Sequence, residues 1–280
     1  MKLTVLVDNN TLIDRYFTAE PGLSLLIEEK DKTLLFDTGY SDLFLKNAGK
    51  MGKDLSCLDH LVISHSHLDH TWGLFHYIQY LTELAIENRA YKRPVLTGHP
   101  DMFTSVSMDG IPELGSLVSK KKAECHMELR LIREPVCLFP GLTFLGQIPR
   151  KNDFEGKTTI GVKQDTGGPD HILDDSALVY ESDQGLVIIA GCAHSGICNT
   201  IAHAQNICNQ TRVADVIGGF HLLDPPQSQL DPTLAFFKDL APAAVHACHC
   251  TDLSSKIALS KVAQVREVGV GMTLDYKSSI

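Results

Sequence analysis

The segment from Ser64 to His70, with the sequence Ser-His-Ser-His-Leu-Asp-His, most constrains what this chain can form, because it concentrates three imidazoles and a carboxylate in one short stretch. It follows the apolar run Leu61 to Ser64, which reads as a buried strand. It precedes Trp72 to about Glu87, where apolar residues recur at helical spacing. The polar cluster is therefore expected on a loop between a strand and a helix.

The spacing inside this loop indicates how the side chains are arranged. Residues two apart on an extended chain point to the same side, so we expect His65 and His67 to lie side by side. Asp69 and His70 would turn towards a neighbouring position as the chain enters the helix. Imidazole nitrogens and carboxylate oxygens together suit zinc, manganese or iron. The spacing therefore predicts that residues of this one loop bind metal, and that they contribute ligands to two ions.

The apolar pattern elsewhere predicts strands in two groups, each followed by strands that alternate with helices. This order favours the α/β class, as an αββα sandwich of two mixed β-sheets flanked by helices. We expect a single domain over residues 1–280, with an insertion at about 101–122 and a polar loop between Pro149 and Pro169. The expected strands are Leu3 to Val7, Leu23 to Glu28, Thr33 to Phe36, Leu61 to Ser64, Glu128 to Ile132, Leu142 to Leu145, Ala177 to Glu181, Leu186 to Ala190, Val213 to Ile217 and Ala243 to Ala247. Further expected helices are Ile197 to Asn209, Pro232 to Leu240 and Ser254 to Val265.

Composition narrows the classes of partner. The 280 residues are 44% hydrophobic and carry a formal net charge of -9. This charge argues against a nucleic-acid partner, although it leaves room for a local basic patch near the pocket. The run Lys120 to Lys122 either attracts an anionic substrate or forms a solvated face. No apolar run reaches the roughly 18 residues that a membrane span requires, and the N-terminus lacks a signal-peptide pattern. We therefore expect a cytoplasmic protein with no membrane partner, whose eight cysteines remain thiols.

Two motifs resemble a known family. His65-x-His67-x-Asp69-His70 resembles the HxHxDH signature of the metallo-β-lactamase superfamily, and the run from Phe36 to Gly39, Phe-Asp-Thr-Gly, resembles its upstream aspartate motif. The resemblance implies the metallo-β-lactamase fold and a role for Asp37 in supporting the site from behind the ligands. Where many members carry Gly-Gly after the signature, this chain has Thr71-Trp72-Gly73. Trp72 either lines the substrate pocket or packs the helix.

Three further polar positions follow strand-like runs: His194 in Gly-Cys-Ala-His-Ser-Gly, His221 in Gly-Gly-Phe-His-Leu, and His249 in Cys-His-Cys-Thr. Their order resembles the branch of the superfamily that includes the dihydropterin-ribofuranosyl-aminobenzene-phosphate synthases, over about residues 23 to 251. The resemblance assigns one metal to His65, His67 and His194. It assigns a second metal to Asp69, His70 and His249.

One departure leaves the bridge between the two metals open. Many members bridge their metals with an aspartate after the strand that here ends at Ala190, and this chain has Gly191-Cys192 instead. Cys192, His194 or His221 could replace the bridge, or water alone could form it. Cys192 is otherwise a supporting residue, and His221 is equally a ligand, a support or a substrate contact. His171, in the loop before a strand, either contacts substrate or is exposed.

The implied activity is hydrolysis of a small-molecule substrate, phosphorylated or pterin-like, by a metal-bound hydroxide at a phosphoryl or carbonyl centre. Two divalent ions, zinc in first place and manganese or iron as alternatives, would be the cofactors, and Asp69 or His221 would move the proton. Neither a Gly-x-Ser-x-Gly motif nor a phosphate-binding Gly-rich loop is present. The rival functions are a di-iron redox protein and a non-catalytic metabolite-binding module. A separate zinc knot at His246, Cys248, His249 and Cys250 lacks a second Cys/His pair at matching spacing.

Overall fold

The computed structural model describes residues 1–279 and divides into two compact units. Unit 1 comprises Met1–Ile132, Ile160–Asp170 and Gly269–Asp275. Unit 2 comprises Arg133–Thr159, His171–Val268 and, up to residue 279, the segment from Tyr276.

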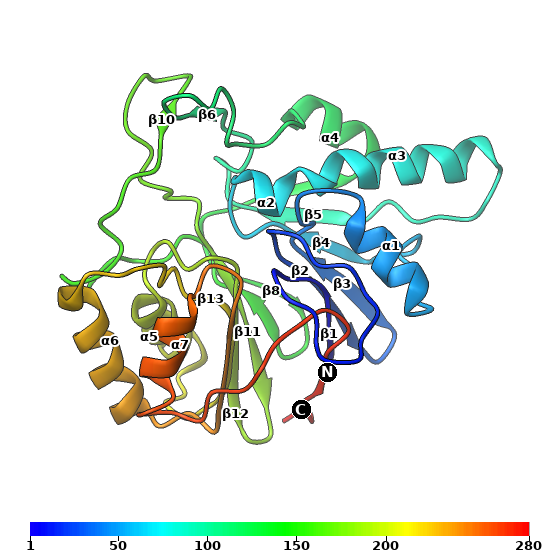
Figure 1. Ribbon diagram of the computed structural model, residues 1–280. Helices are drawn as coiled ribbons and strands as arrows, with labels where there is room; N and C mark the ends of the chain where they lie inside the picture. The colour runs from blue at the N-terminus through cyan, green and yellow to red at the C-terminus, as the bar shows by residue number, and fades with distance from the viewer. Residues whose placement is uncertain (280) are drawn as a thin grey trace. The chain divides into compact units, whose positions relative to one another are not determined.

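Unit 1 is built on a seven-stranded sheet in the order β15-β1-β2-β3-β4-β5-β7. Its first four strands pair antiparallel, whereas β3, β4, β5 and β7 pair parallel. The strands are β1 (Lys2–Val7), β2 (Ser24–Glu29), β3 (Lys32–Phe36), β4 (His60–Val62), β5 (Val95–Gly98), β7 (Glu128–Leu131) and β15 (Thr273–Asp275). The helices of this unit are α1 (Leu43–Lys50), α2 (Leu68–Thr71), α3 (Gly73–Ile86) and α4 (Lys120–His126). Figure 1 shows α1 and α3 beside this sheet.

Unit 2 repeats this plan with six strands in the order β14-β13-β12-β11-β9-β8. Strands β8, β9, β11 and β12 pair antiparallel, and β12, β13 and β14 pair parallel. The strands are β8 (Val136–Phe139), β9 (Leu142–Phe144), β11 (Ala177–Ser182), β12 (Gly185–Ala190), β13 (Val213–Gly219) and β14 (Ala244–Cys248). The helices are α5 (Ile197–Cys208), α6 (Gln227–Leu240) and α7 (Leu253–Leu259), which Figure 1 shows beside the sheet.

Each sheet buries both of its faces. In unit 1, Phe44 of α1 and Tyr77 of α3 pack on one side of the sheet with Leu35 and Leu61. In unit 2, Ile201 of α5 packs with strand residues such as Val216 and Val245. The alternate residues of the same strands, among them Ile27, Phe36, Ile189 and Ile217, are also fully buried. Burial on both faces explains why these strands are continuous apolar runs.

Most expected elements are present, but several boundaries were wrong. The helix expected from Trp72 to about Glu87 is α3, and an unexpected short helix, α2, precedes it. The Gly73 N–H donates to the Gly39 carbonyl, which interrupts the helical pattern between α2 and α3. The helix expected over Ser254 to Val265 ends at Leu259, since the following chain runs beside β14 and Val265 bridges Val245. Helix α6 begins five residues before Pro232, which therefore lies inside the helix.

Some elements were not expected at all, among them α1, α2, β5, β8 and β15. The segment expected as an insertion, residues 101–122, contains β6 (Val106–Ser107) and the start of α4. Strand β6 pairs antiparallel with β10 (Val162–Lys163), so this segment and the polar loop after Pro149 meet in a two-stranded ribbon within unit 1. The lysines at 120–122 form the first turn of α4 and are exposed.

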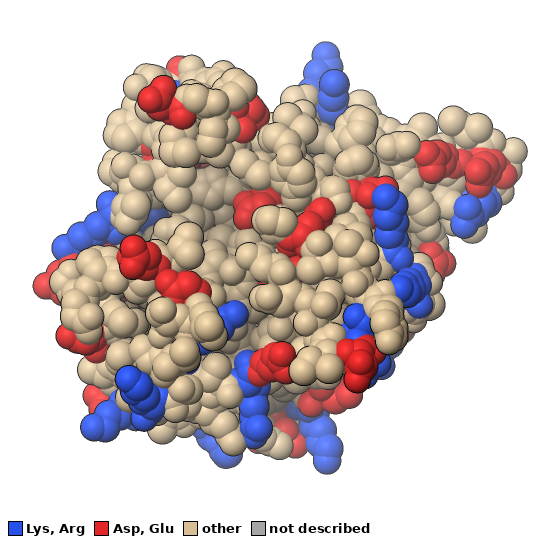
Figure 2. All heavy atoms as spheres, viewed as in Figure 1, with Lys and Arg blue, Asp and Glu red and all other residues tan. Residues whose placement is uncertain are grey.

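No helix among residues 1–279 is long and apolar enough to cross a membrane. On the face that Figure 2 shows, Lys and Arg side chains are interspersed with Asp and Glu.

Candidate metal centre

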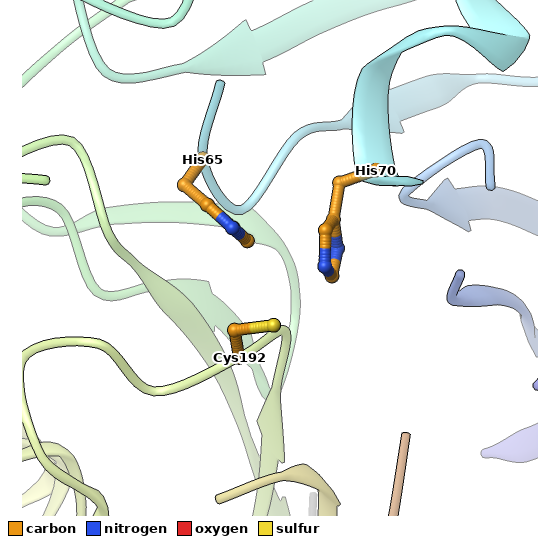
Figure 3. Close-up of side chains that lie close together, drawn as sticks. All are labelled: His65, His70 and Cys192. Atoms are coloured by element: carbon orange, nitrogen blue, oxygen red, sulfur yellow. The ribbon is translucent and has the colours of Figure 1, made fainter. Parts of the chain in front are cut away.

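In unit 1 the loop between β4 and α2 gathers His65, His67, Asp69 and His70, which we call the loop cluster. The His65 Nε2 lies 3.1 Å from the His67 Nδ1, and the ring centroids of His65 and His70 are 4.2 Å apart. Figure 3 shows the His65 and His70 rings pointing into the same space. Asp69 Oδ2 lies 3.8 Å from His70 Nε2. One short segment thus brings nitrogen and oxygen donors together.

Asp37 holds the loop cluster in place. It follows β3, has a left-handed backbone with φ of 58°, and is fully buried. Its Oδ1 accepts the Ser64 N–H at 2.7 Å, and its Oδ2 lies 2.7 Å from His70 Nδ1. An ionised carboxylate only accepts hydrogen bonds, so the His70 Nδ1 carries the proton and its Nε2 is left as the lone-pair donor. This is the arrangement by which a carboxylate orients a metal-binding histidine.

Thr38 and Gly73 fix the start of α3 behind this loop. The Thr38 N–H and hydroxyl donate to the His70 carbonyl at 2.9 and 2.8 Å. A Cβ at Gly73 would lie 2.1 Å from the Thr38 carbonyl oxygen, so only glycine fits there. Trp72 packs on Tyr40 with ring centroids 5.0 Å apart, and its Nε1 donates to the Gly115 carbonyl at 2.8 Å. These contacts give Trp72 a packing role.

In unit 2 the donors come from the ends of three parallel strands, and we call Cys192, His194, His221, His249 and Cys250 the strand-end cluster. Strands β12, β13 and β14 run in the same direction, so their carboxyl ends meet at one edge of the sheet. Figure 3 shows Cys192 at the end of β12. The rings of His194 and His221 are 4.3 Å apart, and His249 Nε2 lies 3.1 Å from the Cys192 sulfur.

The backbone at these strand ends is unusual. Ala193, His221 and His249 have φ of 52°, 49° and 52°, in the left-handed region that such residues rarely adopt. Each residue lies just after a strand of the parallel half. Conformations of this kind are concentrated at functional sites, where surrounding contacts stabilise them. An extended chain would carry these side chains past the edge of the sheet. The sharp turns place them at that edge instead.

Two buried carboxylates that no sequence pattern predicted hold the turn after β12. Asp175 Oδ2 accepts the Ser195 N–H at 2.8 Å, and burial raises the pKa of this carboxyl although the Ser195 and His194 N–H groups favour its charged form. Glu155 accepts the Asn199 and Cys198 N–H groups at the start of α5, at 2.6 and 3.2 Å. The available signal was weak: Asp175 precedes a buried strand, whereas Glu155 lies in an irregular loop.

His221 differs from the other histidines of the strand-end cluster. Burial lowers its pKa, but the adjacent Cys250 sulfur and the charge of Asp175 outweigh this effect, so the net pKa is raised. Its Nδ1 is buried and has no hydrogen-bond partner among the described residues. Its backbone N–H donates to the Cys250 sulfur at 3.3 Å. An orphaned ring nitrogen beside sulfur and nitrogen donors fits a divalent metal such as zinc.

A pocket of about 610 Å³ lies within unit 2, beside His194 and His221. Phe154, Lys157 and Gln229 also line it. His171 does not: its side chain is exposed, and its carbonyl accepts a hydrogen bond from Arg150. A smaller pocket in unit 1, of about 240 Å³, borders His67 and Asp69.

The alternative zinc knot does not form within residues 1–279. His246 instead lies 2.9 Å from Asp215 through its Nδ1, and no group of three potential metal ligands among the described residues includes His246 or Cys248. In contrast, Cys192, His249 and Cys250 form such a group, with all three ligand atoms within 4.8 Å of one another.

Comparisons with known proteins show the family of this chain. The family model of the metallo-beta-lactamase superfamily matches residues 17–204. The chain is 31% identical to the 7,8-dihydropterin-6-methyl-4-(beta-D-ribofuranosyl)-aminobenzene-5'-phosphate synthase of Methanocaldococcus jannaschii, over 91% of this chain and 89% of that protein. An uncharacterized protein of the same organism is 28% identical over 96% of both chains.

Among solved structures, a metal-dependent hydrolase of the beta-lactamase superfamily, Tm1679, matches with a TM-score of 0.80 and 26% identity, covering 98% of both chains. The extent of these matches confirms the resemblance that the histidine and aspartate motifs indicated. This chain therefore belongs to the metallo-β-lactamase superfamily and has its α/β sandwich fold.

Proposed function

We propose that this protein is a dinuclear metal-dependent hydrolase acting on a phosphorylated or pterin-like small molecule. The observation that carries the proposal is the contact between Asp37 and His70, because it presents the His70 Nε2 as a lone-pair donor within a loop of further donors. His246 also contacts a carboxylate, that of Asp215, but among the described residues only His70 of these two histidines belongs to a group of potential metal ligands.

The proposed ligand set is the one that the family motifs imply. His65, His67 and His194 would hold one ion, and Asp69, His70 and His249 would hold the other. Zinc fits this donor set best, and manganese or iron is the alternative. When bound, such ions lower the pKa of water towards about 7 and polarise the bond under attack.

The chain's own residues would then bind the substrate and move the proton. The volume of the unit 2 pocket, about 610 Å³, lies within the range of small-molecule sites, roughly 300–1,000 Å³. Phe154 offers an aromatic face there, and Lys157 offers a positive charge to a phosphate. His221, with its raised pKa, and Asp69 are the candidates to transfer the proton. Water is added across the bond, so no covalent enzyme intermediate is needed.

The substrate class is supported by the name of the M. jannaschii relative, which includes a dihydropterin and a phosphate ester. That relative is a synthase, so we infer for this chain the substrate chemistry, a phosphorylated heteroaromatic molecule, rather than the same reaction. Hydrolysis is supported by the description of Tm1679 as a metal-dependent hydrolase.

Metal analysis of purified full-length protein tests the ligand set. We expect His67→Ala and His249→Ala each to lower the bound metal, while His126→Ala, at the end of α4, leaves it unchanged. Full metal retention by either variant would remove that residue from the set. A coloured di-iron protein with no hydrolytic activity would replace the proposal with a redox function.

Turnover of phosphodiester, lactone and thioester panels tests the reaction. Lys157→Ala should raise KM for phosphorylated substrates by about tenfold, as expected for the loss of a charged hydrogen bond. It should leave KM for an uncharged ester unchanged, and Lys151→Ala, outside the pocket lining, should change neither. Metal-loaded protein that turns over no substrate yet binds a pterin would instead be a metabolite-binding module.

A further inference from the structure

The strand-end cluster contains two thiols that the proposed ligand set does not use. Cys192 follows β12 and is 4% exposed, while Cys250 follows β14. Although 58 residues apart in sequence, they are adjacent within unit 2, where the Cys250 sulfur lies 3.5 Å from the Cys192 carbonyl oxygen. Both belong with His249 to the group whose ligand atoms all lie within 4.8 Å of one another.

The surrounding contacts favour the Cys192 and Cys250 sulfurs in their positions beside His249. The Cys192 sulfur lies 3.1 Å from His249 Nε2. A Cβ at Gly219 would lie 2.5 Å from the Cys250 sulfur and 3.1 Å from the His249 ring, so the absence of a side chain there makes room for both. The His221 N–H donates to the Cys250 sulfur at 3.3 Å, which favours a thiolate.

We propose that Cys192 and Cys250 bind metal through sulfur, together with His249, so that the ion at His249 is thiolate-bound. Two thiolates and a neutral imidazole are ligands that favour zinc over manganese. The inference deepens the proposed function, from which it takes His249 as a metal ligand. Sulfur donors would also account for the carboxylate missing after β12.

Cobalt titration of the metal-stripped, full-length protein tests this proposal. Bound Co²⁺ should give a sulfur-to-cobalt charge-transfer band in the near ultraviolet. Cys192→Ser and Cys250→Ser should each lower this band by roughly half, as expected for one of two sulfur ligands, and the double variant should abolish it. Cys208→Ser, a half-buried thiol at the end of α5, is the matched control and should leave the band unchanged.

Alkylation of the unmodified sequence avoids any effect of substitution on folding. Zinc should protect Cys192 and Cys250 from alkylation, and a chelator should restore the reaction, while the exposed Cys57 reacts equally in both states. Equal alkylation of Cys192 and Cys250 with and without zinc would overturn the proposal. A Cys192–Cys250 disulfide that persists in zinc-loaded protein would overturn it as well, in favour of a redox pair.

The outcomes separate this proposal from the proposed function. If Co²⁺ binding is lost in His67→Ala but the wild type gives no sulfur-to-cobalt band, the thiolate proposal is wrong and the hydrolase proposal stands. A sulfur band that survives His67→Ala would support the thiolate ligands whatever the fate of the hydrolase. Failure of Co²⁺ to bind at all would overturn both.

Discussion

The loop cluster of unit 1 and the strand-end cluster of unit 2 arise from the same sheet plan in different ways. Both lie where parallel strands end, but the loop cluster comes from a single segment, His65 to His70, whereas the strand-end cluster comes from three strands. Each rests on a buried aspartate, Asp37 or Asp175, that accepts a backbone N–H from the neighbouring turn.

The two aspartates act on different parts of the chain. Asp37 contacts a histidine ring directly at 2.7 Å, so it fixes the orientation and proton position of a side chain. Asp175 accepts the N–H of Ser195, so it fixes a backbone turn that has φ of 52° at Ala193 and 97° at Gly196. Side-chain hydrogen bonding therefore orients donors in unit 1, and backbone conformation orients them in unit 2.

The largest effect is expected at Asp37. Asp37→Ala should weaken metal binding by roughly 10–100-fold, because His70 loses the carboxylate that fixes its protonation. Equilibrium dialysis measures this loss, and Asp37→Asn, which retains an acceptor oxygen, should fall between the variant and the wild type. If Asp37→Ala bound metal with unchanged affinity, Asp37 would not orient a metal ligand, and the two aspartates would not differ in the way described above.

Asp175 should affect stability more than metal binding. Asp175→Ala leaves the buried Ser195 N–H without this acceptor, which costs about 1–3 kcal/mol of unfolding free energy in chemical denaturation. Asp175→Asn retains an acceptor without a buried charge and should cost less. A loss of metal affinity as large as that of Asp37→Ala, with unchanged stability, would show that Asp175 acts on a ligand after all.

Glu155 should give a smaller, pH-dependent effect. Burial raises the pKa of this carboxyl above 4.5, against the opposing contacts with Asn152, Asn199 and Cys198. From pH 4.5 up to the raised value, the folded protein therefore holds a proton that the unfolded chain has lost. The contribution of Glu155 to stability consequently falls as pH rises through this window. Glu155→Gln should remove this slope, as measured by denaturation at several pH values, and an unchanged slope would contradict the assignment.

The smallest effect is expected at His171. Its side chain is exposed and only its carbonyl is held, so His171→Ala should change stability by less than about 0.5 kcal/mol and leave KM unchanged. Steady-state kinetics checks this expectation. A raised KM would instead support the substrate contact that the sequence predicted for this residue.

The difference between the clusters also explains what could be predicted from sequence. The loop cluster could be predicted because its donors all lie between His65 and His70, and their spacing directly reflects the strand-to-helix turn. His194, His221 and His249 were recognised from short motifs at strand exits. Asp175, Glu155 and the pairing of Cys192 with Cys250 were not, because their contacts join segments 20 to 58 residues apart.

The fold shows the same division. Strands with continuous apolar runs, such as β12 and β13, were found because burial on both faces leaves a strong local signal. Helix α1 and strand β15 were missed, since α1 buries only part of its surface and β15 pairs with β1 from the other end of the sequence, as Lys2 with Asp275. The end of α7 was misplaced because the bridge between Val245 and Val265 interrupts a pattern that could otherwise continue as helix.

The sequence by itself determined the family, the α/β class and which side chains gather in the loop cluster, because these depend on local spacing and on which residues must be buried. Tertiary structure decided which atoms of the strand-end cluster meet and which carboxylates hold them. The physical reason is that parallel strands bring their carboxyl ends to one edge whatever the length of chain between them. The register of β12, β13 and β14 therefore joins Cys192 to His249 and Cys250, a contact that no local pattern encodes.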